Sequence, residues 1–412
     1  MNTIYINKIA VKDSMAQIGI ATQTELAERL GITKNQLSLM LSEKYNPFKI
    51  KYQELCEILK IQPEALLYEY EPQEDNSLKI NHNRSNITAI ELFAGGGGLA
   101  LGLEEAGIET LAHVEFDKGC CETLKVNRPN WNVICKDISE VDFTEYRNKI
   151  DIVTGGFPCQ AFSYAGKKMG FEDTRGTLFY EFARCIAETQ PLMFMAENVR
   201  GLISHDEGRT LSTIMEIFKE LGYNVQYKLL KTVEYEVPQK RERIVIVGSK
   251  DGINFSYPEK NKNMKTLKDA LFEVPISEGQ KYSESKKAVF DLVPPGGCWR
   301  DLPEDVKKTY MGKSYYSGGG RTGMARRISW DEPCLTLTCS PSQKQTDRCH
   351  PDEVRPFTVR EYARIQTFPD NWQFCGGIGD RYKQIGNAVP VLLAKKLGNS
   401  LKDALLEYRK SL

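Results

Sequence analysis

Apolar residues near the N-terminus recur at intervals of three and four, which is the spacing of helices with one buried face. The three groups that show this spacing are Leu26, Ala27 and Leu30, then Leu37, Met40 and Leu41, then Leu55, Ile58 and Leu59. This pattern predicts an all-helical domain over residues 1–70. Residues 71–86 are polar and contain Pro72 and several asparagines, so we predict a linker there.

From Ile87 the pattern changes to short apolar runs that end in glycine or an acidic residue, separated by helical stretches. These runs predict strands near 88–93, 110–115, 133–134, 151–154, 192–196, 225–230 and 243–247. Strands that alternate with helices predict an α/β domain, with a mainly parallel sheet and helices on both of its faces. We expect this domain to span residues 87–255.

Residues 256–350 lose this rhythm and are rich in glycine, proline, serine, lysine and arginine. Helical spacing returns from Arg355 and continues to the C-terminus.

Charge and cysteine content restrict the class of protein. The 55 basic and 55 acidic residues cancel, which excludes a uniformly basic DNA-packaging protein but leaves room for a local basic groove. No apolar run approaches the roughly 18–20 residues of a membrane span, and the N-terminus lacks the apolar core of a signal peptide. We therefore expect a cytoplasmic protein with reduced thiols. Its eleven cysteines include no C-x-x-C pair, and we expect no metal site.

Residues 24–38 (TELAERLGITKNQLS) predict a helix, a glycine turn and a second helix. Gly31 suits the left-handed residue after the first helix, and Thr33 can cap the second. The segment resembles the helix-turn-helix of Cro/repressor-type regulators. The resemblance implies that the second helix presents polar side chains to a DNA major groove, namely Lys34, Asn35, Gln36 and Ser38. A small helical bundle used for packing or dimerisation is the alternative.

A glycine cluster follows the first predicted strand, within residues 89–102. Glycines allow a ligand to approach the backbone closely, although a tight strand–helix turn would need them too. Glu115 ends the next strand and could bind ribose hydroxyls, while Asp137 follows the third strand and could accept from an adenine amino group. Phe93 precedes the glycines and could stack on a base. Because ligands bind at the carboxyl ends of such strands, we predict an adenosine-containing cofactor.

Cys159 follows Pro158 in a loop that leaves a predicted strand. A lone loop cysteine is often inert, but a thiolate is also a strong nucleophile. Glu197 ends the next strand, so it should lie near Cys159 at the same sheet edge. A thiolate beside a carboxyl group suits addition to an electron-poor ring, with the acid protonating a ring nitrogen. Arg241 and Arg243 could bind a phosphate or a carbonyl oxygen, or could belong to a solvated turn.

Six segments resemble, in this order, the motifs of bacterial DNA (cytosine-5)-methyltransferases of restriction–modification systems. They are ELFAGGGG (91–98), GGFPCQAFS (155–163), ENVRGL (197–202), QKRERIVIVG (239–248), VREYARIQTFP (359–369) and QIGNAVPVLLA (384–394). The resemblance implies a Rossmann-like methyltransferase fold that uses S-adenosylmethionine. It also implies a target recognition domain over 256–350 and a return to the catalytic domain over 351–412.

The resemblance implies a role for each motif residue. Cys159 would add to C6 of a cytosine that has been flipped out of the duplex, and Glu197 would contact N3 and assist by protonation. Arg243 would orient the cytosine and its phosphate, with Arg241 supporting the loop. The residues that would line the cofactor site are Phe93, Gly95, Gly97, Glu115, Asp137, Leu178 and Asn387.

The same resemblance indicates where DNA would be contacted. Residues 160–178 would form a loop that closes over DNA, with Gln160 and Ser163 facing it. In the target recognition domain, the basic candidates are Arg321, Arg326, Arg327, Lys344 and Arg348. Such side chains can contact phosphates or guanine edges, but several of them could instead support the fold.

Two other functions stay open at this point. A tRNA methyltransferase of the same family would keep the catalytic motifs but would not need a helix-turn-helix. A transcriptional repressor would use residues 1–70 and leave the rest vestigial, although the intact catalytic motifs argue against this. A dual role, in which the enzyme also binds its own promoter, is a further hypothesis. We expect double-stranded DNA as substrate and a cognate restriction endonuclease as functional counterpart. We also expect a monomer on the methylation site, with dimerisation through the helix-turn-helix possible.

Overall fold

The computed structural model divides into two compact units, Met1–Asn81 and His82–Leu412. The boundary between them falls within the predicted linker. The residues that the structure describes are 3–6, 8–32, 37, 41, 52–62, 67–70, 86–158, 177–316 and 323–412.

Among its described residues, the N-terminal unit contains helices α1 (Lys8–Gln17), α2 (Gln23–Arg29) and α4 (Tyr52–Leu59). The second helix expected from residues 24–38 lies largely outside the described residues. The apolar faces of the three described helices form one core that includes Leu26, Leu30 and Leu55. Thr22 caps α2 by accepting a hydrogen bond from the backbone N–H of Glu25 at 3.2 Å, and Gly31 has the expected positive φ of +66°. The helical spacing in this part of the sequence therefore predicts the core correctly.

Two short strands were not expected in this unit. Strand β1 (Thr3–Ile6) pairs antiparallel with β2 (Leu67–Tyr70), so the unit is not all-helical. Their sequences, TIYI and LYEY, are rich in β-branched and aromatic residues, which favour strands. The predicted DNA-reading residues Lys34, Asn35, Gln36 and Ser38 lie outside the described residues.

The larger unit is built on a seven-stranded sheet with the order β5-β4-β3-β6-β7-β10-β8. Its strands are β3 (Ile87–Leu92), β4 (Ile108–Glu115), β5 (Val133–Cys135), β6 (Ile152–Gly155), β7 (Met193–Val199), β8 (Asn224–Lys231) and β10 (Glu242–Ser249). Each corresponds to one of the predicted strands. Strand β10 runs antiparallel to both of its neighbours, and the other pairs in the sheet are parallel, so the mainly parallel α/β fold is confirmed.

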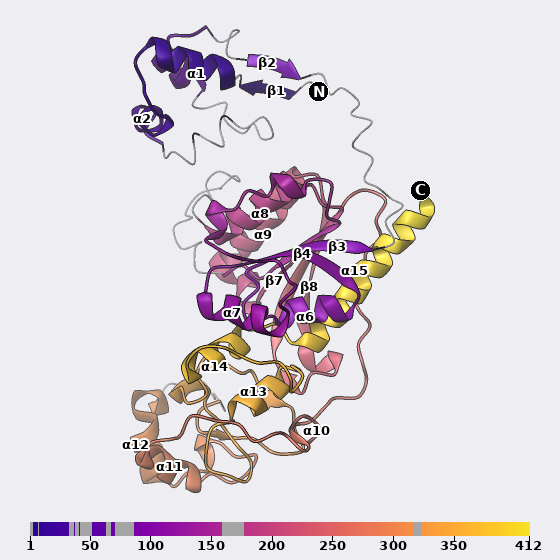
Figure 1. Cartoon of the computed structure of the whole chain (residues 1–412). Helices are drawn as coiled ribbons and strands as arrows, with labels where there is room; N and C mark the ends of the chain where they lie inside the picture. The colour runs from indigo at the N-terminus through magenta and orange to yellow at the C-terminus, as the bar shows by residue number, and fades with distance from the viewer. Residues whose placement is uncertain are drawn as a thin grey trace. The chain divides into compact units, whose positions relative to one another are not determined.

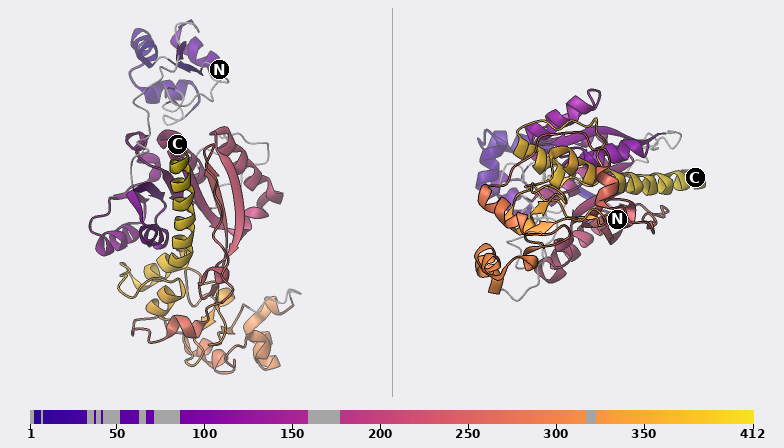
Figure 2. Two further views of the ribbon diagram at one scale, coloured as in Figure 1. Left: turned by 90° about the vertical axis from the view of Figure 1, so that its right-hand side faces the viewer. Right: turned by 90° about the horizontal axis from the view of Figure 1, so that it is seen from below.

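Helices cover both faces of this sheet (Figure 1, Figure 2). They are α6 (Gly98–Glu105), α7 (Lys118–Asn127), α8 (Leu178–Thr189), α9 (Arg209–Glu220) and α15 (Val391–Ser411). Helix α15 packs closely on α6, because an added Cβ on Gly102 would lie 2.4 Å from the Ala394 Cβ. The C-terminal residues thus return to the α/β layer. No described helix is both long and apolar enough to cross a membrane.

A smaller, irregular region follows β10. It contains α10 (Leu267–Leu271), α11 (Glu284–Asp291), α12 (Glu304–Met311) and two-residue strands β11 (Arg326–Arg327), β12 (Cys334–Leu335) and β13 (Arg348–Cys349). It has its own core around Tyr282, Phe290 and Val293. Strand β12 pairs with β9 (Gln239–Lys240), which directly precedes β10 and so joins this region to the sheet. Helices α13 (Val359–Ile365) and α14 (Ile378–Asn387) connect the region to α15.

The glycine turn after β3 is shaped by the C-terminal part of the chain. The indole N–H of Trp372 donates to the Gly96 carbonyl at 3.1 Å. A Cβ on Gly97 would lie 2.6 Å from Trp372, and one on Gly98 would lie 2.2 Å from the Val389 carbonyl oxygen. The turn therefore needs glycine for close packing as well as for any ligand.

We predict that Gly97→Ala lowers the free energy of unfolding of the large unit by about 2–4 kcal/mol. The new methyl group would overlap Trp372, and alanine would also have to adopt a φ of +88°. Urea denaturation followed by tryptophan fluorescence measures the change. Gly379→Ala is the matched control, because an added Cβ there meets no atom within 4 Å. Equal stability of the two variants would contradict the packing argument.

Candidate active site

The ends of strands β6 and β7 bring together the starts of two motif segments, GGFPCQAFS (155–163) and ENVRGL (197–202). The strands are parallel neighbours, with Gly155 paired to Ala196. Just beyond this pair, the buried Asn198 side chain donates to the Phe157 carbonyl at 2.8 Å, and a Cβ on Gly156 would lie 3.0 Å from Glu197 Oε2. The loop after β6 is thus fixed against Glu197 up to Pro158, where the described segment ends.

The predicted nucleophile Cys159 lies outside the described residues, as do Gln160 and Ser163. The described geometry brings Pro158, the residue that precedes Cys159 in the sequence, to the same sheet edge as Glu197.

Glu197 is paired with Arg243 in a nearly buried ion pair. Arg243 Nε lies 2.6 Å from Glu197 Oε1, and each side chain is 13% exposed. The register of β7 and β10 explains the contact, because Arg243 pairs with Val199 and Val245 pairs with Glu197. Arg243 also donates to the Glu242 carbonyl at 2.8 Å. The guanidinium therefore holds the carboxylate in place at the strand edge.

Arg241 has a different environment and is only 1% exposed. Its guanidinium donates to the carbonyls of Leu337 at 3.2 Å and Ala388 at 3.1 Å, with Asn387 at 3.5 Å. Burial, together with the nearby positive charge of Arg243, lowers the pKa of Arg241 to about 9. Arg241 thus joins three separate chain segments, a geometry that favours support of the loop over contact with substrate.

The cofactor candidates lie at the carboxyl ends of β3, β4 and β5. Glu115 Oε2 accepts from the Gly95 N–H at 2.7 Å, and its Oε1 accepts from the N–H groups of Phe116 at 2.9 Å and Asp117 at 2.7 Å. Asp137 is exposed and accepts from both the N–H and the hydroxyl of Ser139. These hydrogen bonds, led by the backbone one, lower the pKa of Asp137. Two carboxylates, each oriented by hydrogen bonds, therefore lie at this end of the sheet.

Two aromatic residues, Phe93 and Phe116, directly follow β3 and β4. The sequence predicted a role for Phe93 alone. Phe93, the predicted stacking residue, has a left-handed φ of +58° and is half-buried. Phe116 was missed by the sequence analysis, yet it is 72% exposed directly after Glu115. A large apolar ring so exposed beside a ligand-type carboxylate is a candidate for stacking. Its position immediately after a strand-ending acid was the signal available in the sequence.

The last two cofactor candidates lie on other elements. Leu178 is the first residue of α8 and is half-buried. Asn387 is the last residue of α14 and is exposed, with its Oδ1 accepting from the Cys339 thiol at 2.9 Å.

Three of the arginines proposed to contact DNA donate hydrogen bonds to other groups of the protein. Arg326 donates to the Gly297 carbonyl at 3.0 Å and pairs with Glu332. The other two, Arg327 and Arg348, also donate to backbone carbonyls. These contacts favour a role in supporting the fold, and their contact with DNA stays a prediction. Arg321 lies outside the described residues.

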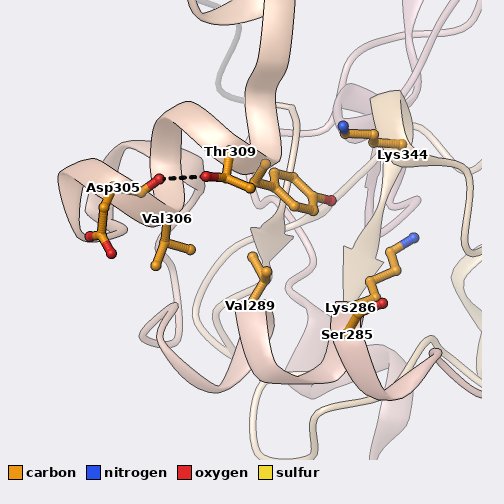
Figure 3. Close-up of a pocket in the computed structure, with 8 residues that line it drawn as sticks. Ser285, Lys286, Val289, Asp305, Val306, Thr309 and Lys344 are labelled. Carbon is orange, nitrogen blue, oxygen red and sulfur yellow. Dashed lines mark hydrogen bonds between the residues drawn. The ribbon is translucent and has the colours of Figure 1, made fainter.

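Lys344 is the basic candidate that borders a described pocket between α11 and α12 (Figure 3). Its amine lies 4.9 Å from the centre of the Tyr310 ring. Lys286 borders the same pocket, but its amine is paired with the buried carboxylate of Asp347 at 2.7 Å. Of these two lysines, Lys344 is therefore the better candidate for contact with a phosphate.

The comparisons with known proteins decide the family. The model of the C-5 cytosine-specific DNA methylases matches residues 87–403. The chain belongs to this family. A second model, of Cro/C1-type helix-turn-helix DNA-binding domains, matches residues 11–73. The methyltransferase and the helix-turn-helix expected from the sequence are thus both confirmed.

Curated relatives cover nearly the whole chain. Type II methyltransferase M.Sau96I of Staphylococcus aureus is 50% identical over 98% of this chain and 99% of that protein. Type II methyltransferase M.Eco47II of Escherichia coli is 51% identical over 94% of this chain and 96% of that protein. The chain is accordingly a DNA cytosine-5 methyltransferase of the restriction–modification type, which sets aside the tRNA and vestigial-repressor alternatives.

Solved structures support the fold at much lower identity. A Spodoptera frugiperda DNMT2 mutant matches with a TM-score of 0.57 and 16% identity, over 77% of this chain and 100% of that chain. The methyltransferase EhMeth of Entamoeba histolytica matches with a TM-score of 0.55 and 14% identity, over 78% and 99%. The methyltransferase fold is therefore retained with little sequence in common.

We predict that Arg327→Ala lowers the free energy of unfolding by about 1–3 kcal/mol, because three carbonyl oxygens lose their donor. Lys344→Ala should change stability by less than about 0.5 kcal/mol, because among the described residues its amine contacts only the Tyr310 ring. Chemical denaturation of both variants checks the contrast. An Arg327→Ala protein as stable as Lys344→Ala would show that Arg327 does not support the fold.

Proposed function

We propose that this enzyme methylates C5 of a cytosine within a specific duplex sequence, with Cys159 as nucleophile and S-adenosylmethionine as methyl donor. The observation that supports this proposal most strongly is the ion pair of Glu197, at the end of β7, with Arg243, at the start of β10, beside the loop that follows β6. This arrangement would let three motifs that are distant in sequence act on one cytosine ring.

The reaction follows from the chemistry of these side chains. A cytosine inside a duplex must first be flipped out of the stack, because its C6 is otherwise covered. The Cys159 thiolate then forms a bond to C6, and Glu197 stabilises the ring by hydrogen bonding and proton transfer at N3. This makes C5 nucleophilic. Once C5 carries the methyl group, loss of the C5 proton to a base and departure of the Cys159 sulfur restore the aromatic ring.

The donor set at the ends of β4 and β5 fits an adenosine-containing cofactor. The Glu115 carboxylate suits ribose hydroxyls, Asp137 suits an adenine amino group, and the exposed Phe116 ring suits the face of a base. Gly95, Gly97, Phe93, Leu178 and Asn387 would complete this site. S-adenosylmethionine, when bound, supplies an electrophilic methyl group to the activated C5.

The irregular region after β10 is the proposed target recognition domain. Lys344 is its favoured contact with DNA, since its amine is not committed to an ion pair among the described residues. The helix-turn-helix unit is proposed to bind the promoter of its own gene through Lys34, Asn35, Gln36 and Ser38, as a monomer or a dimer. We further propose a cytoplasmic enzyme with a cognate restriction endonuclease as its functional counterpart.

Methyl transfer from labelled S-adenosylmethionine to unmethylated duplex DNA tests the proposed activity, with bisulfite sequencing of the product. We expect modified cytosines in one short sequence motif and at least about a thousandfold loss of rate in Cys159→Ala, since the covalent route is removed. Methylation of duplex DNA by Cys159→Ala at the wild-type rate would overturn the assignment of the nucleophile.

We predict that Phe116→Ala weakens binding of S-adenosylmethionine about tenfold, because stacking of a base on an aromatic ring contributes about 1–3 kcal/mol. Isothermal titration calorimetry measures the dissociation constant. Phe272→Ala is the matched control, because this ring is also exposed, at 69%, but lies in the region after β10. Unchanged affinity in Phe116→Ala would remove the stacking role.

Promoter binding can be separated from catalysis in the full chain. The double substitution Lys34→Ala/Gln36→Ala should reduce occupancy of the promoter DNA more than about tenfold and leave the methylation rate unchanged. Cys159→Ala should show the opposite pattern. Footprinting and methyl-transfer assays measure the two properties, and unchanged occupancy in the double variant would end the autorepressor hypothesis.

A further inference from the structure

The Cys339 thiol makes a contact that the proposed mechanism does not use. Among the cysteines that the structure describes, Cys339 is exposed, Cys135 and Cys375 are half-buried, and the others are buried. Cys339 Sγ lies 2.9 Å from Asn387 Oδ1, across 48 residues of sequence. An S–H group donates and an amide oxygen accepts, so this contact fixes which end of the Asn387 amide is engaged.

The backbone on both sides of this contact is held rigidly. Arg241 donates to the carbonyl of Leu337, two residues before Cys339, and to that of Ala388, directly after Asn387. A Cβ on Gly386 would lie 2.4 Å from the Thr338 carbonyl oxygen, so the two segments touch. These backbone contacts thus hold Cys339 beside Asn387.

We propose that Cys339 is a positioning residue that orients the Asn387 amide for the cofactor. With Oδ1 held by the thiol, the Asn387 NH2 group is directed away from Cys339 and can donate to an acceptor atom of S-adenosylmethionine. This inference rests on the proposed function, because it takes Asn387 to be part of the cofactor site. It adds a residue from the target recognition region to that site.

Substitutions of Cys339 separate the hydrogen bond from the mere presence of a side chain. Cys339→Ala removes the donor and should raise KM for S-adenosylmethionine about threefold to tenfold with kcat nearly unchanged, as expected for loss of one hydrogen bond. Cys339→Ser keeps a donor and should restore KM to within about twofold of wild type. Cys375→Ser is the control, since this half-buried cysteine lies outside the contact and should leave both constants unchanged. A KM for Cys339→Ala equal to that of wild type would overturn the proposal.

Alkylation tests the same contact without relying on substitution. In a Cys159→Ala background, iodoacetamide should weaken equilibrium binding of S-adenosylmethionine more than about tenfold, because the added group would displace the Asn387 amide. The protein that also carries Cys339→Ser should be insensitive. Equal sensitivity of the two proteins would contradict the proposal. A wild-type protein that binds no S-adenosylmethionine would instead overturn the cofactor assignment, and this inference with it.

Discussion

The rest of the site depends on the hydrogen bonds that the buried Arg241 guanidinium donates to backbone carbonyls. A cation removed from water is costly unless acceptors surround it, and here the acceptors are backbone carbonyls from two segments far away in sequence. Residues 337 and 388 are therefore held against the start of β10. Because Arg243 lies two residues further along, the same anchor sets the position of the ion pair with Glu197. The start of β10, the region after β10 and the C-terminal segment are thus joined by one side chain.

The second constraint is the parallel order of the strands. The parallel strands all end at the same edge of the sheet; they are β3, β4, β5, β6 and β7. The acids and loops that follow these strands therefore lie close together, although they are distant in sequence. The antiparallel β10 then brings its first residues, rather than its last, to that edge. This reversal explains why Arg243 stands at the beginning of its strand while Glu197 stands near the end of its own.

The strands were predictable because each is a short apolar run that ends in a turn residue, a signal contained in a few neighbouring residues. The glycine turn was predictable only in part: its glycines were visible, but their packing on Trp372 depends on a residue about 275 positions away. The pair β1–β2 was missed because each strand has only four residues and its partner lies at the other end of the unit. Arg326, Arg327 and Arg348 each donate to a backbone carbonyl that lies 25 to 34 residues away in sequence, so these partners were not predictable.

Cys159 is proposed to add covalently to a cytosine at the sheet edge where β6 and β7 end and β10 begins. A duplex in which the target cytosine carries fluorine at C5, incubated with the enzyme and S-adenosylmethionine, tests this addition directly. After methyl transfer, fluorine cannot leave C5 as the proton does, so the Cys159 sulfur cannot be eliminated. The account predicts a protein–DNA adduct that survives denaturation and maps by mass spectrometry to the peptide containing Cys159. Methyl transfer to normal DNA without any such adduct, or an adduct on another residue, would contradict it.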